Sequence, residues 1–137
     1  MRFATALAAL AAAVGLCAAQ GAMAQTAIDG IWRNPKNSVH VRIASCGVAA
    51  CGHVVWASDK ARRDAREGGT PELIGLELFR DFVQQKSGAW KGKVFVPDLN
   101  STFNGTAEQT DAATLKAKGC LIGGLLCKTQ TWRRIEG

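Results

Sequence analysis

The chain has 137 residues, of which 47% are hydrophobic and 20% are charged, and its formal net charge is +6 at pH 7. This length supports one hydrophobic core and excludes a second sizeable domain. The 17 basic residues are spread along the chain without interleaved aromatic residues, so a nucleic-acid-binding protein is not expected. A moderate positive charge would suit an anionic surface of the cell envelope, but an ordinary solvated face is the simpler interpretation.

The first 24 residues have the pattern of a secretory signal peptide. Arg2 supplies a positive start, residues 3–16 are almost wholly Ala, Leu and Val, and Ala22-Met23-Ala24 is a cleavage site of the A-x-A type. The apolar stretch is shorter than the roughly 20 residues that a membrane span needs. We therefore expect an exported protein that has no transmembrane segment in its mature form.

Two consequences follow for the organisation of the chain. We expect a signal peptide over residues 1–24 and a single domain over residues 25–137. Cys17 allows a lipoprotein with an acylated cysteine as the alternative, although Leu16 is a poor residue directly before such a cysteine.

Apolar and polar residues alternate with a period of two through most of the mature chain, which predicts β-strands. After an expected strand at residues 30–33, the strand segments are 39–44, 53–57, 76–82, 90–96, 102–108, 114–118 and 128–135. Turn residues such as Asn34-Pro35, Ser87-Gly88 and Pro97-Asp98 separate them. The mature chain is thus predicted to be all-β, with about eight antiparallel strands.

Residues 58–72 interrupt this pattern. They hold seven charged side chains between positions 59 and 67, followed by Gly68-Gly69-Thr70-Pro71. We predict a charged loop here, with room for one helical turn that the glycines would end. A loop of this length in a compact domain is often functional.

Four cysteines remain in the mature chain, an even number that favours two structural disulfides in a small exported domain. Cys46 and Cys51 are symmetric about Val48-Ala49, and Cys120 and Cys127 are symmetric about Gly123-Gly124, a favoured hairpin turn. Directly opposed residues in a hairpin are close enough to be bridged. We therefore predict the pairs Cys46–Cys51 and Cys120–Cys127. The spacing fits neither a zinc site nor a redox C-x-x-C pair.

Consecutive antiparallel strands favour a meander that closes into a small up-and-down β-barrel, because closure removes exposed sheet edges. Closure would bring the first strand, with Gly30 and Trp32, beside the last strand, with Trp132 and Arg134. Gly30 would allow the backbones to approach closely, and Arg134 would stack on Trp32 at one end of the barrel. An eight-stranded barrel is either filled by its side chains or holds one small ligand.

An ordered set of motifs resembles the exported bacterial family known as domain of unknown function 2147. The motifs are Gly30-Ile31-Trp32, Cys46 with Cys51-Gly52-His53-Val54-Val55-Trp56, Leu73-Ile74-Gly75-Leu76, Trp90-Lys91-Gly92, Pro97 with Phe103, Leu115-Lys116-Ala117-Lys118-Gly119-Cys120 and Thr129-Gln130-Thr131-Trp132-Arg133-Arg134. The resemblance covers nearly the whole mature chain. It implies a lipocalin-like fold and a periplasmic or secreted protein, and it implies no activity.

The chain departs from the usual family pattern at several positions. Phe95 and Phe103 stand where tyrosine is usual, Asn100 replaces a glycine, and Arg133 replaces a threonine. Asn100 is a residue that tolerates the left-handed backbone expected at that turn. The segment 58–72 also differs, so ligand specificity cannot be carried over from relatives.

Candidate chemistry is sparse. The two histidines, His40 and His53, lie on predicted strands several residues apart and have no evident third partner, so we expect no metal site and no cofactor. There is no G-x-S-x-G motif, and no other nucleophile arrangement is recognisable. We therefore do not expect an enzyme.

Three functions remain to be compared. The leading hypothesis is a non-catalytic envelope protein that binds a small apolar ligand in or near the barrel mouth, with Trp56, Trp90, Phe95 and Phe103 as candidate lining residues. Each of the four could instead be an ordinary core residue. The alternatives are a filled barrel whose charged segment 59–67 and basic face contact another envelope component, and an enzyme acting on a cell-wall or lipid substrate.

Overall fold

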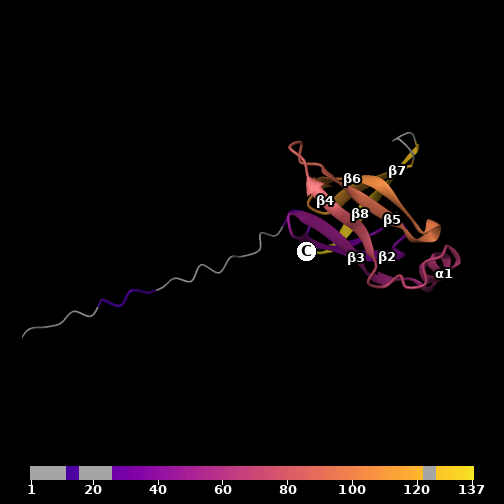
Figure 1. Cartoon of the computed structure of the whole chain (residues 1–137), viewed down its shortest axis with the longest axis horizontal. Coiled ribbons are helices and arrows are strands. Elements are labelled where there is room, and N and C mark those ends of the chain that lie inside the picture. The colour runs from indigo at the N-terminus through magenta and orange to yellow at the C-terminus, as the bar shows by residue number, and fades with distance from the viewer. Residues whose placement is uncertain (1–11, 16–25, 122–125) are drawn as a thin grey trace, which may run out of the picture.

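The computed structural model describes residues 12–15, 26–121 and 126–137. Most of the predicted signal peptide, the lipoprotein candidate Cys17 and the turn at Gly123-Gly124 lie outside the described residues. Among those described, eight strands form a closed antiparallel barrel in which each strand pairs with the next and β8 returns to β1 (Figure 1). The predicted all-β, up-and-down barrel is confirmed.

The elements follow the predicted order closely. The strands are β1 (Gly30–Arg33), β2 (Val39–Cys46), β3 (Ala49–Ala57), β4 (Glu77–Gln84), β5 (Trp90–Val96), β6 (Ser101–Asp111), β7 (Thr114–Leu121) and β8 (Leu126–Glu136). A helix, α1 (Asp59–Glu67), connects β3 to β4, and a 3-10 helix, η1 (Pro97–Leu99), connects β5 to β6. Asn100 follows η1 with a left-handed backbone, as expected from its position.

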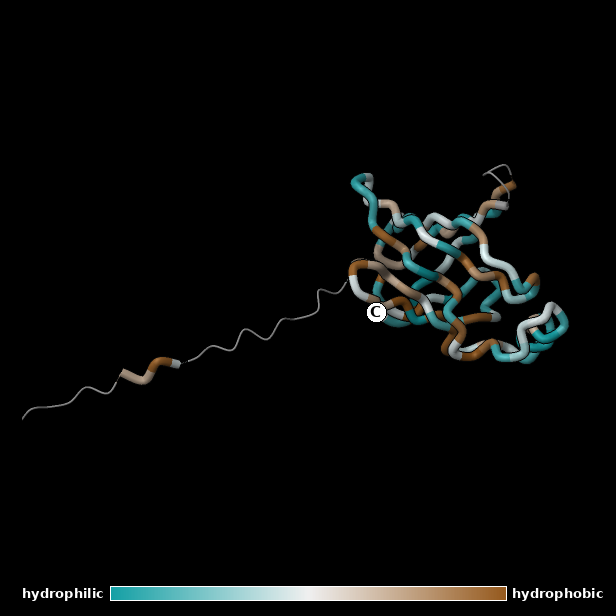
Figure 2. The backbone as a smooth tube through the Cα atoms, in the orientation of Figure 1, coloured by the Kyte–Doolittle hydropathy of each residue, from teal (hydrophilic) through white to brown (hydrophobic). Residues whose placement is uncertain are grey.

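The alternating connections give the barrel two different ends. The α1 end carries α1, η1 and the β1–β2 connection, whereas the terminal end carries the β2–β3, β4–β5 and β6–β7 turns together with residues 26–29 and the end of β8. Figure 1 shows α1 and the C-terminus on opposite sides of the barrel. Hydrophobic and hydrophilic residues alternate along the strands in Figure 2, so one face of each strand points into a common core. Trp32, Val41, Val54 and Leu115 are the largest fully buried side chains.

The segment expected to be a charged loop contains a nine-residue helix instead. Ser58 caps it by accepting a hydrogen bond from the Ala61 amide at 3.1 Å, and Lys60 pairs with Asp64 one turn later at 2.7 Å. Ala65 is fully buried against the barrel. Gly68 ends the helix so close to the backbone of Asp98 in η1 that a Cβ atom would clash there. The helix therefore anchors to the barrel through small side chains and its C-terminal glycine.

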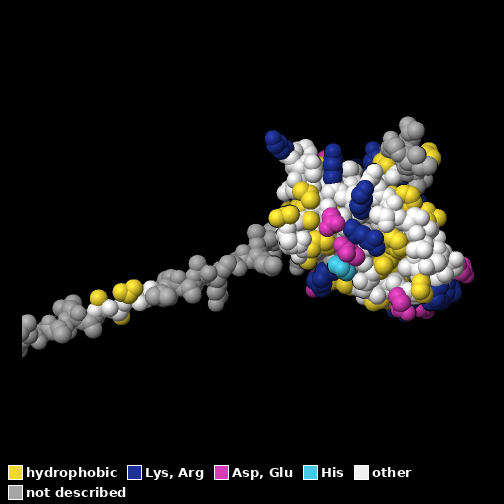
Figure 3. All heavy atoms as spheres, viewed as in Figure 1, with side chains coloured by type: hydrophobic (Ala, Val, Ile, Leu, Met, Phe, Trp, Pro, Cys, Tyr) yellow, Lys and Arg dark blue, Asp and Glu magenta, His cyan; other side chains and the backbone are white. Residues whose placement is uncertain are grey.

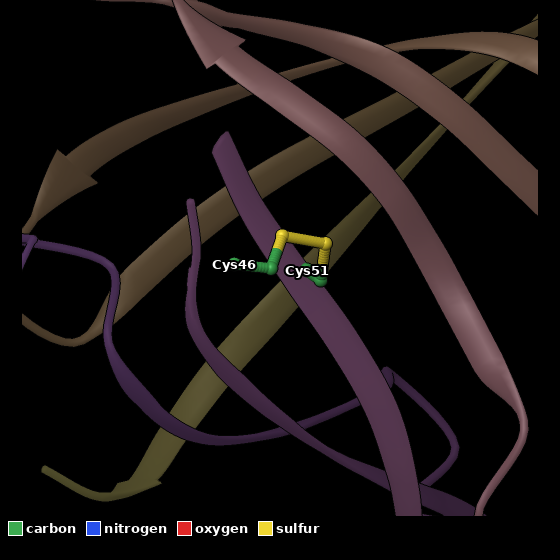
Figure 4. The surroundings of a disulfide bond; sticks show 2 residues. All are labelled: Cys46 and Cys51. Atoms are coloured by element: carbon green, nitrogen blue, oxygen red, sulfur yellow. A yellow bond between two sulfur atoms is a disulfide. The ribbon is translucent and has the colours of Figure 1, made fainter. Parts of the chain in front are cut away.

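Both predicted disulfides are present, but one predicted register is wrong. Cys120 lies directly opposite Cys127, as expected. Cys46 lies opposite Ala49 rather than Cys51, so the register differs by two residues and the bridge is diagonal, with Cα atoms 5.8 Å apart (Figure 4). The reason is a two-residue turn that begins at Gly47, where the backbone φ is +76°. Glycine in the first central position favours such a tight hairpin.

Candidate functional site

The first and last strands close the barrel at its terminal end. Trp32 is fully buried and its indole Nε1 donates to the Ile28 carbonyl at 2.9 Å. The Arg134 guanidinium lies over the Trp32 ring, 4.4 Å from the centroid. A Cβ on Gly30 would overlap the backbone of Glu136, so this glycine permits the pairing of β1 with β8. These contacts join β1 to β8 at the terminal end of the barrel.

Two phenylalanines fill the middle of the barrel. The rings of Phe79 and Phe82 meet edge to face with centroids 5.7 Å apart, and Phe79 meets Trp132 in the same way at 5.2 Å. Both phenylalanines come from β4, where a bulge between Arg80 and Val83 interrupts the regular pairing with β5. Because of this bulge, side chains three residues apart both point inward.

Glycines on the surrounding strands make room for these rings. A Cβ on Gly52 would lie 2.7 Å from the Phe79 ring, and one on Gly92 would lie 2.6 Å from the Phe82 ring. On Gly105 it would lie 2.5 Å from a methyl group of Val94 and 3.3 Å from Phe82. Contacts this short do not occur between well-packed atoms, so the rings occupy space that only glycine leaves free.

Little space remains between these side chains. A residual cavity between these side chains measures about 10 Å³ and is lined only by apolar residues, namely Ile28, Ile43, Ala50, Phe79, Phe82, Ala107, Leu115 and Ala117. A single water needs roughly 10–15 Å³ and two or more polar partners. This part of the barrel therefore has no room for an organic ligand.

The structure separates the four residues that were expected to line a binding site. Trp90 and Phe103 lie on the inner faces of β5 and β6, where Trp90 is buried in the core and Phe103 is half-buried toward the α1 end. Phe95 lies on the outer face of β5, and the Arg80 guanidinium covers its ring at 4.8 Å. Trp56 also lies outside, with 42% of its surface exposed.

The position of Trp56 corrects the expectation of simple alternation along β3. The pairing of β2 with β3 shifts between His40 and Val41, so Val41 pairs with Val54 while His40 pairs with Trp56. The bulge turns Trp56 to the outer face although Val54, two residues earlier, points inward. Trp56, Trp90, Phe95 and Phe103 therefore do not form one ligand site.

The outer face of β1, β2, β3 and β8 holds a group that was not singled out from the sequence. His40 stacks against Trp56 with ring centroids 4.5 Å apart, and its Nε2 lies 2.7 Å from the Asn37 side-chain oxygen. Burial and, to a lesser degree, the neighbouring Arg33 guanidinium lower the pKa of His40 below its usual value. Arg33 in turn lies directly opposite Arg133 on β8. The sequence places these residues on predicted strands, but it shows that they lie side by side on one face only after the register of the strands is known.

A metal site does not emerge from these side chains. Within residues 12–15, 26–121 and 126–137, no group of three or more His, Cys, Asp or Glu side chains is placed to hold a metal ion. His53 pairs with Arg42 and lies apart from His40 in the register, as expected. In the same described ranges, no helix is both long and apolar enough to cross a membrane.

Comparison with known proteins identifies a similar structure and a matching sequence family. Protein HP1028 from the human pathogen Helicobacter pylori, described as belonging to the lipocalin family, is similar in structure, with a TM-score of 0.61 over 78% of this chain and 82% of that chain. The two sequences are 17% identical, so the similarity concerns the fold alone. No curated protein matches the sequence. A family model described as an uncharacterized protein conserved in bacteria, DUF2147, matches residues 30–134. The chain therefore belongs to the DUF2147 family of bacterial proteins and has a lipocalin-like barrel.

Proposed function

We propose that this protein is a non-catalytic component of the bacterial cell envelope, with a barrel filled by its own side chains and a partner that binds to its outer surface. The observation that carries the proposal is the interior cavity of about 10 Å³. Pockets that bind drug-sized molecules usually measure about 300–1,000 Å³. The barrel then serves as a rigid scaffold rather than as a container.

The filling is built into the backbone as well as into the side chains. Phe79 and Phe82 rest against positions 52, 92 and 105, where even an alanine would collide with a neighbouring side chain. Opening a ligand cavity here requires both rings to leave the interior, which would expose or relocate several buried aromatic contacts. Burying one phenylalanine contributes about 1.5–3 kcal/mol, so a small ligand would have to replace two such contributions.

Export supports the envelope part of the proposal. The sequence pattern of residues 1–24 is that of a signal peptide, and the domain from residue 25 contains two disulfides, Cys46–Cys51 and Cys120–Cys127. Disulfides persist in oxidising compartments such as the periplasm and are rare in the cytosol. We accordingly assign the mature protein, residues 25–137, to the periplasm or the extracellular medium.

A small apolar ligand at the α1 end is the second candidate. Phe103, Val94 and Val96 on the inner faces of β5 and β6 are only half-buried toward this end, whereas Trp90 farther along β5 is buried. A ligand that covers these three side chains would gain hydrophobic stabilisation without entering the filled middle of the barrel.

Native mass spectrometry of the protein purified from its own bacterial envelope tests the two candidates. The filled barrel predicts the bare mass of the disulfide-bonded chain and no fluorescence increase of an added apolar naphthalene dye. A retained lipid-like molecule, or dye binding that Phe103→Ala weakens, would favour the second candidate. Leu115→Ala serves as the positive control, because Leu115 lines the cavity and its truncation creates a dry apolar space that a benzene-sized probe can occupy.

A further inference from the structure

One row of side chains crosses the outer face of five neighbouring strands. In the strand register, Thr114 on β7 lies opposite Arg133 on β8, which lies opposite Arg33 on β1. Arg33 in turn lies opposite His40 on β2, and His40 lies opposite Trp56 on β3. Neighbouring strands are about 4.8 Å apart, so the row from Arg133 to Trp56 is roughly 14 Å long. It places two guanidinium groups and an exposed indole on one continuous surface.

The two arginines at its centre are an unfavourable pair in the free protein. Like charges directly opposite each other on neighbouring strands destabilise a sheet. Arg133 donates to the Thr114 hydroxyl at 2.7 Å. The described residues contain one ion pair, Lys60–Asp64, so no carboxylate pairs directly with Arg33 or Arg133. The pKa of the Asp111 carboxyl is lowered mainly by the hydrogen bond from the Ala113 amide, and the Arg133 guanidinium lies near enough to contribute, whereas no such neighbour is seen for Arg33 among the described residues. An anion between the two guanidinium groups would relieve the repulsion.

A second pair of basic residues, Arg80 on β4 and Lys93 on β5, is also directly opposed in the register. There the Arg80 guanidinium covers the Phe95 ring and Lys93 donates to the side-chain oxygen of Asn104, and Asp and Glu side chains lie among the basic residues of this face (Figure 3). That pattern is expected of a solvated surface. The Arg33–Arg133 pair, whose two positions are likewise directly opposed in the register, differs because it lies beside the exposed contact between His40 and Trp56.

The aromatic part of the row is exposed and held in place. Trp56 keeps 42% of its surface exposed while one side of its ring packs against His40. His40 is held by its contact with Asn37 at 2.7 Å, and burial and, to a lesser degree, Arg33 lower its pKa. Tryptophan is enriched at binding interfaces, where one part of its ring is apolar and another is in contact with polar groups.

We propose that Arg33, Arg133, His40 and Trp56 bind the anionic end of a saccharide, a sugar ring that carries a phosphate or a carboxylate. The guanidinium groups would clamp the anionic oxygens through charge-assisted, bidentate hydrogen bonds. The C–H face of the sugar would pack on the indole of Trp56. This inference rests on the proposed function, because it identifies the chemistry of a partner on the outer surface of the filled barrel.

The site can be tested by titrating the disulfide-bonded protein with glucose 1-phosphate, glucuronate, inorganic phosphate and methyl glucoside. Nuclear magnetic resonance would follow the indole N–H of Trp56 and the ring protons of His40. At least one of the two anionic sugars should shift both sets of signals, and the neutral glucoside should shift neither. A bound anion should also raise the pKa of His40, because a nearby negative charge favours the protonated ring.

Variants separate the two halves of the site. Arg33→Gln should weaken binding of the anionic sugar about tenfold or more, since it removes a charge-assisted contact. Trp56→Ala should weaken the same sugar roughly three- to tenfold and leave inorganic phosphate unchanged. Lys91→Gln on β5, across the barrel, removes the same charge and should leave binding unaltered. Arg33→Gln should fold at least as stably as the original chain, because it removes one of two positive charges at directly opposed positions.

Several results would overturn the assignment. Equal weakening by Lys91→Gln and Arg33→Gln would mean a general charge effect, and equal affinity for inorganic phosphate and the anionic sugars would remove the role of Trp56. Shifts caused by anionic phospholipid vesicles and by none of the sugars would replace the saccharide with a membrane surface. None of these results would alter the filled interior, which the mass-spectrometric and dye experiments measure separately.

Discussion

Arg134 is the side chain whose removal tests the barrel closure most directly. Its guanidinium covers the ring of Trp32 and joins three separate segments of the terminal end. Nε donates to the Ala112 carbonyl at 2.8 Å, and the terminal nitrogens donate to the carbonyls of Asp29 and Ala27. Arg134→Ala would remove all of these contacts while leaving the strand pairing of β1 with β8 in place.

The expected loss follows from the burial of each contact. A cation–π contact at a partly exposed site contributes about 1 kcal/mol. The bond to Asp29 is partly buried, and we assign it about 1 kcal/mol; the bonds to Ala112 and Ala27 are exposed, and we assign them about 0.5 kcal/mol each. The free energy of unfolding should therefore fall by about 3 kcal/mol. For a domain of this size Tm should fall by roughly 10 °C.

Urea unfolding followed by tryptophan fluorescence measures this loss, with both disulfides intact. Arg134→Lys keeps the charge but loses the planar fork, so it should cost roughly half as much. Arg66→Ala on the exposed face of α1 is the matched control and should change the free energy of unfolding by less than about 0.5 kcal/mol. If Arg134→Ala changed stability no more than this control, the guanidinium would not be closing the barrel.

Three further predictions concern the packing, the helix and the titration of the outer face. Gly105→Ala should lower the free energy of unfolding by about 1–3 kcal/mol, because the added Cβ would collide with a valine of β5. Gly119 lies opposite it on the paired strand, and a Cβ there would meet nothing within 4 Å. Gly119→Ala should therefore leave the stability measured by denaturant unfolding nearly unchanged. Ser58→Ala should cost about 1 kcal/mol by removing the cap of α1, with the loss detectable by hydrogen exchange of the helix amides. Because burial and Arg33 lower the pKa of His40 below its reference value of 6.5, the folded chain binds fewer protons than the unfolded chain below that pH. The free energy of unfolding should thus be independent of His40 above pH 6.5 and should decrease as the pH falls toward the pKa of His40 in the folded chain. Arg33→Gln should raise that pKa in a proton titration. An unchanged pKa would exclude the arginine as a cause.

The closure of the barrel could be predicted from the sequence because its signals are local and its topology is simple. Period-two alternation defined the strands, and turn residues separated them. Once neighbouring strands pair in order, only the first and last edges remain, so Gly30 and Trp32 had to meet Trp132 and Arg134. The observed register of β1 with β8 and the stacking of Arg134 on Trp32 agree with that expectation.

The bulges explain most of what could not be predicted. Simple alternation places Phe79 and Phe82 on opposite faces and Trp56 on the same face as Val54. In the structure Asp81 adopts a φ of +52° within the bulge of β4, so both phenylalanines point inward. The shift between β2 and β3 turns Trp56 outward. A bulge inserts one extra residue into a strand, so the residues after it point to the opposite face from the one that alternation predicts. No residue type marks the position of a bulge reliably.

The length of the helix α1 was underestimated for a different reason, since one helical turn was predicted and nine helical residues are observed. A surface helix is normally recognised by a wide apolar stripe with a period of 3.6 residues. Here the side facing the barrel carries only Ala61 and Ala65, which are small, while the remaining positions from 59 to 67 are charged. The stop signal at Gly68 was visible, but the packing of that glycine against Asp98 depends on a contact between distant parts of the chain.

Because the interior is filled, ligand binding inside the barrel cannot be inferred from the lipocalin-like fold alone. A barrel backbone sets the number of strands, whereas the side chains determine whether the interior is empty. Phe79 and Phe82 occupy the centre, and glycines at positions 52, 92 and 105 are placed so that these rings fit. Truncation of Phe79 or Phe82 would open a cavity only by removing ring contacts that stabilise the barrel. Selection for a binding pocket would not be expected to produce this arrangement, and selection for a rigid scaffold with a functional outer surface would.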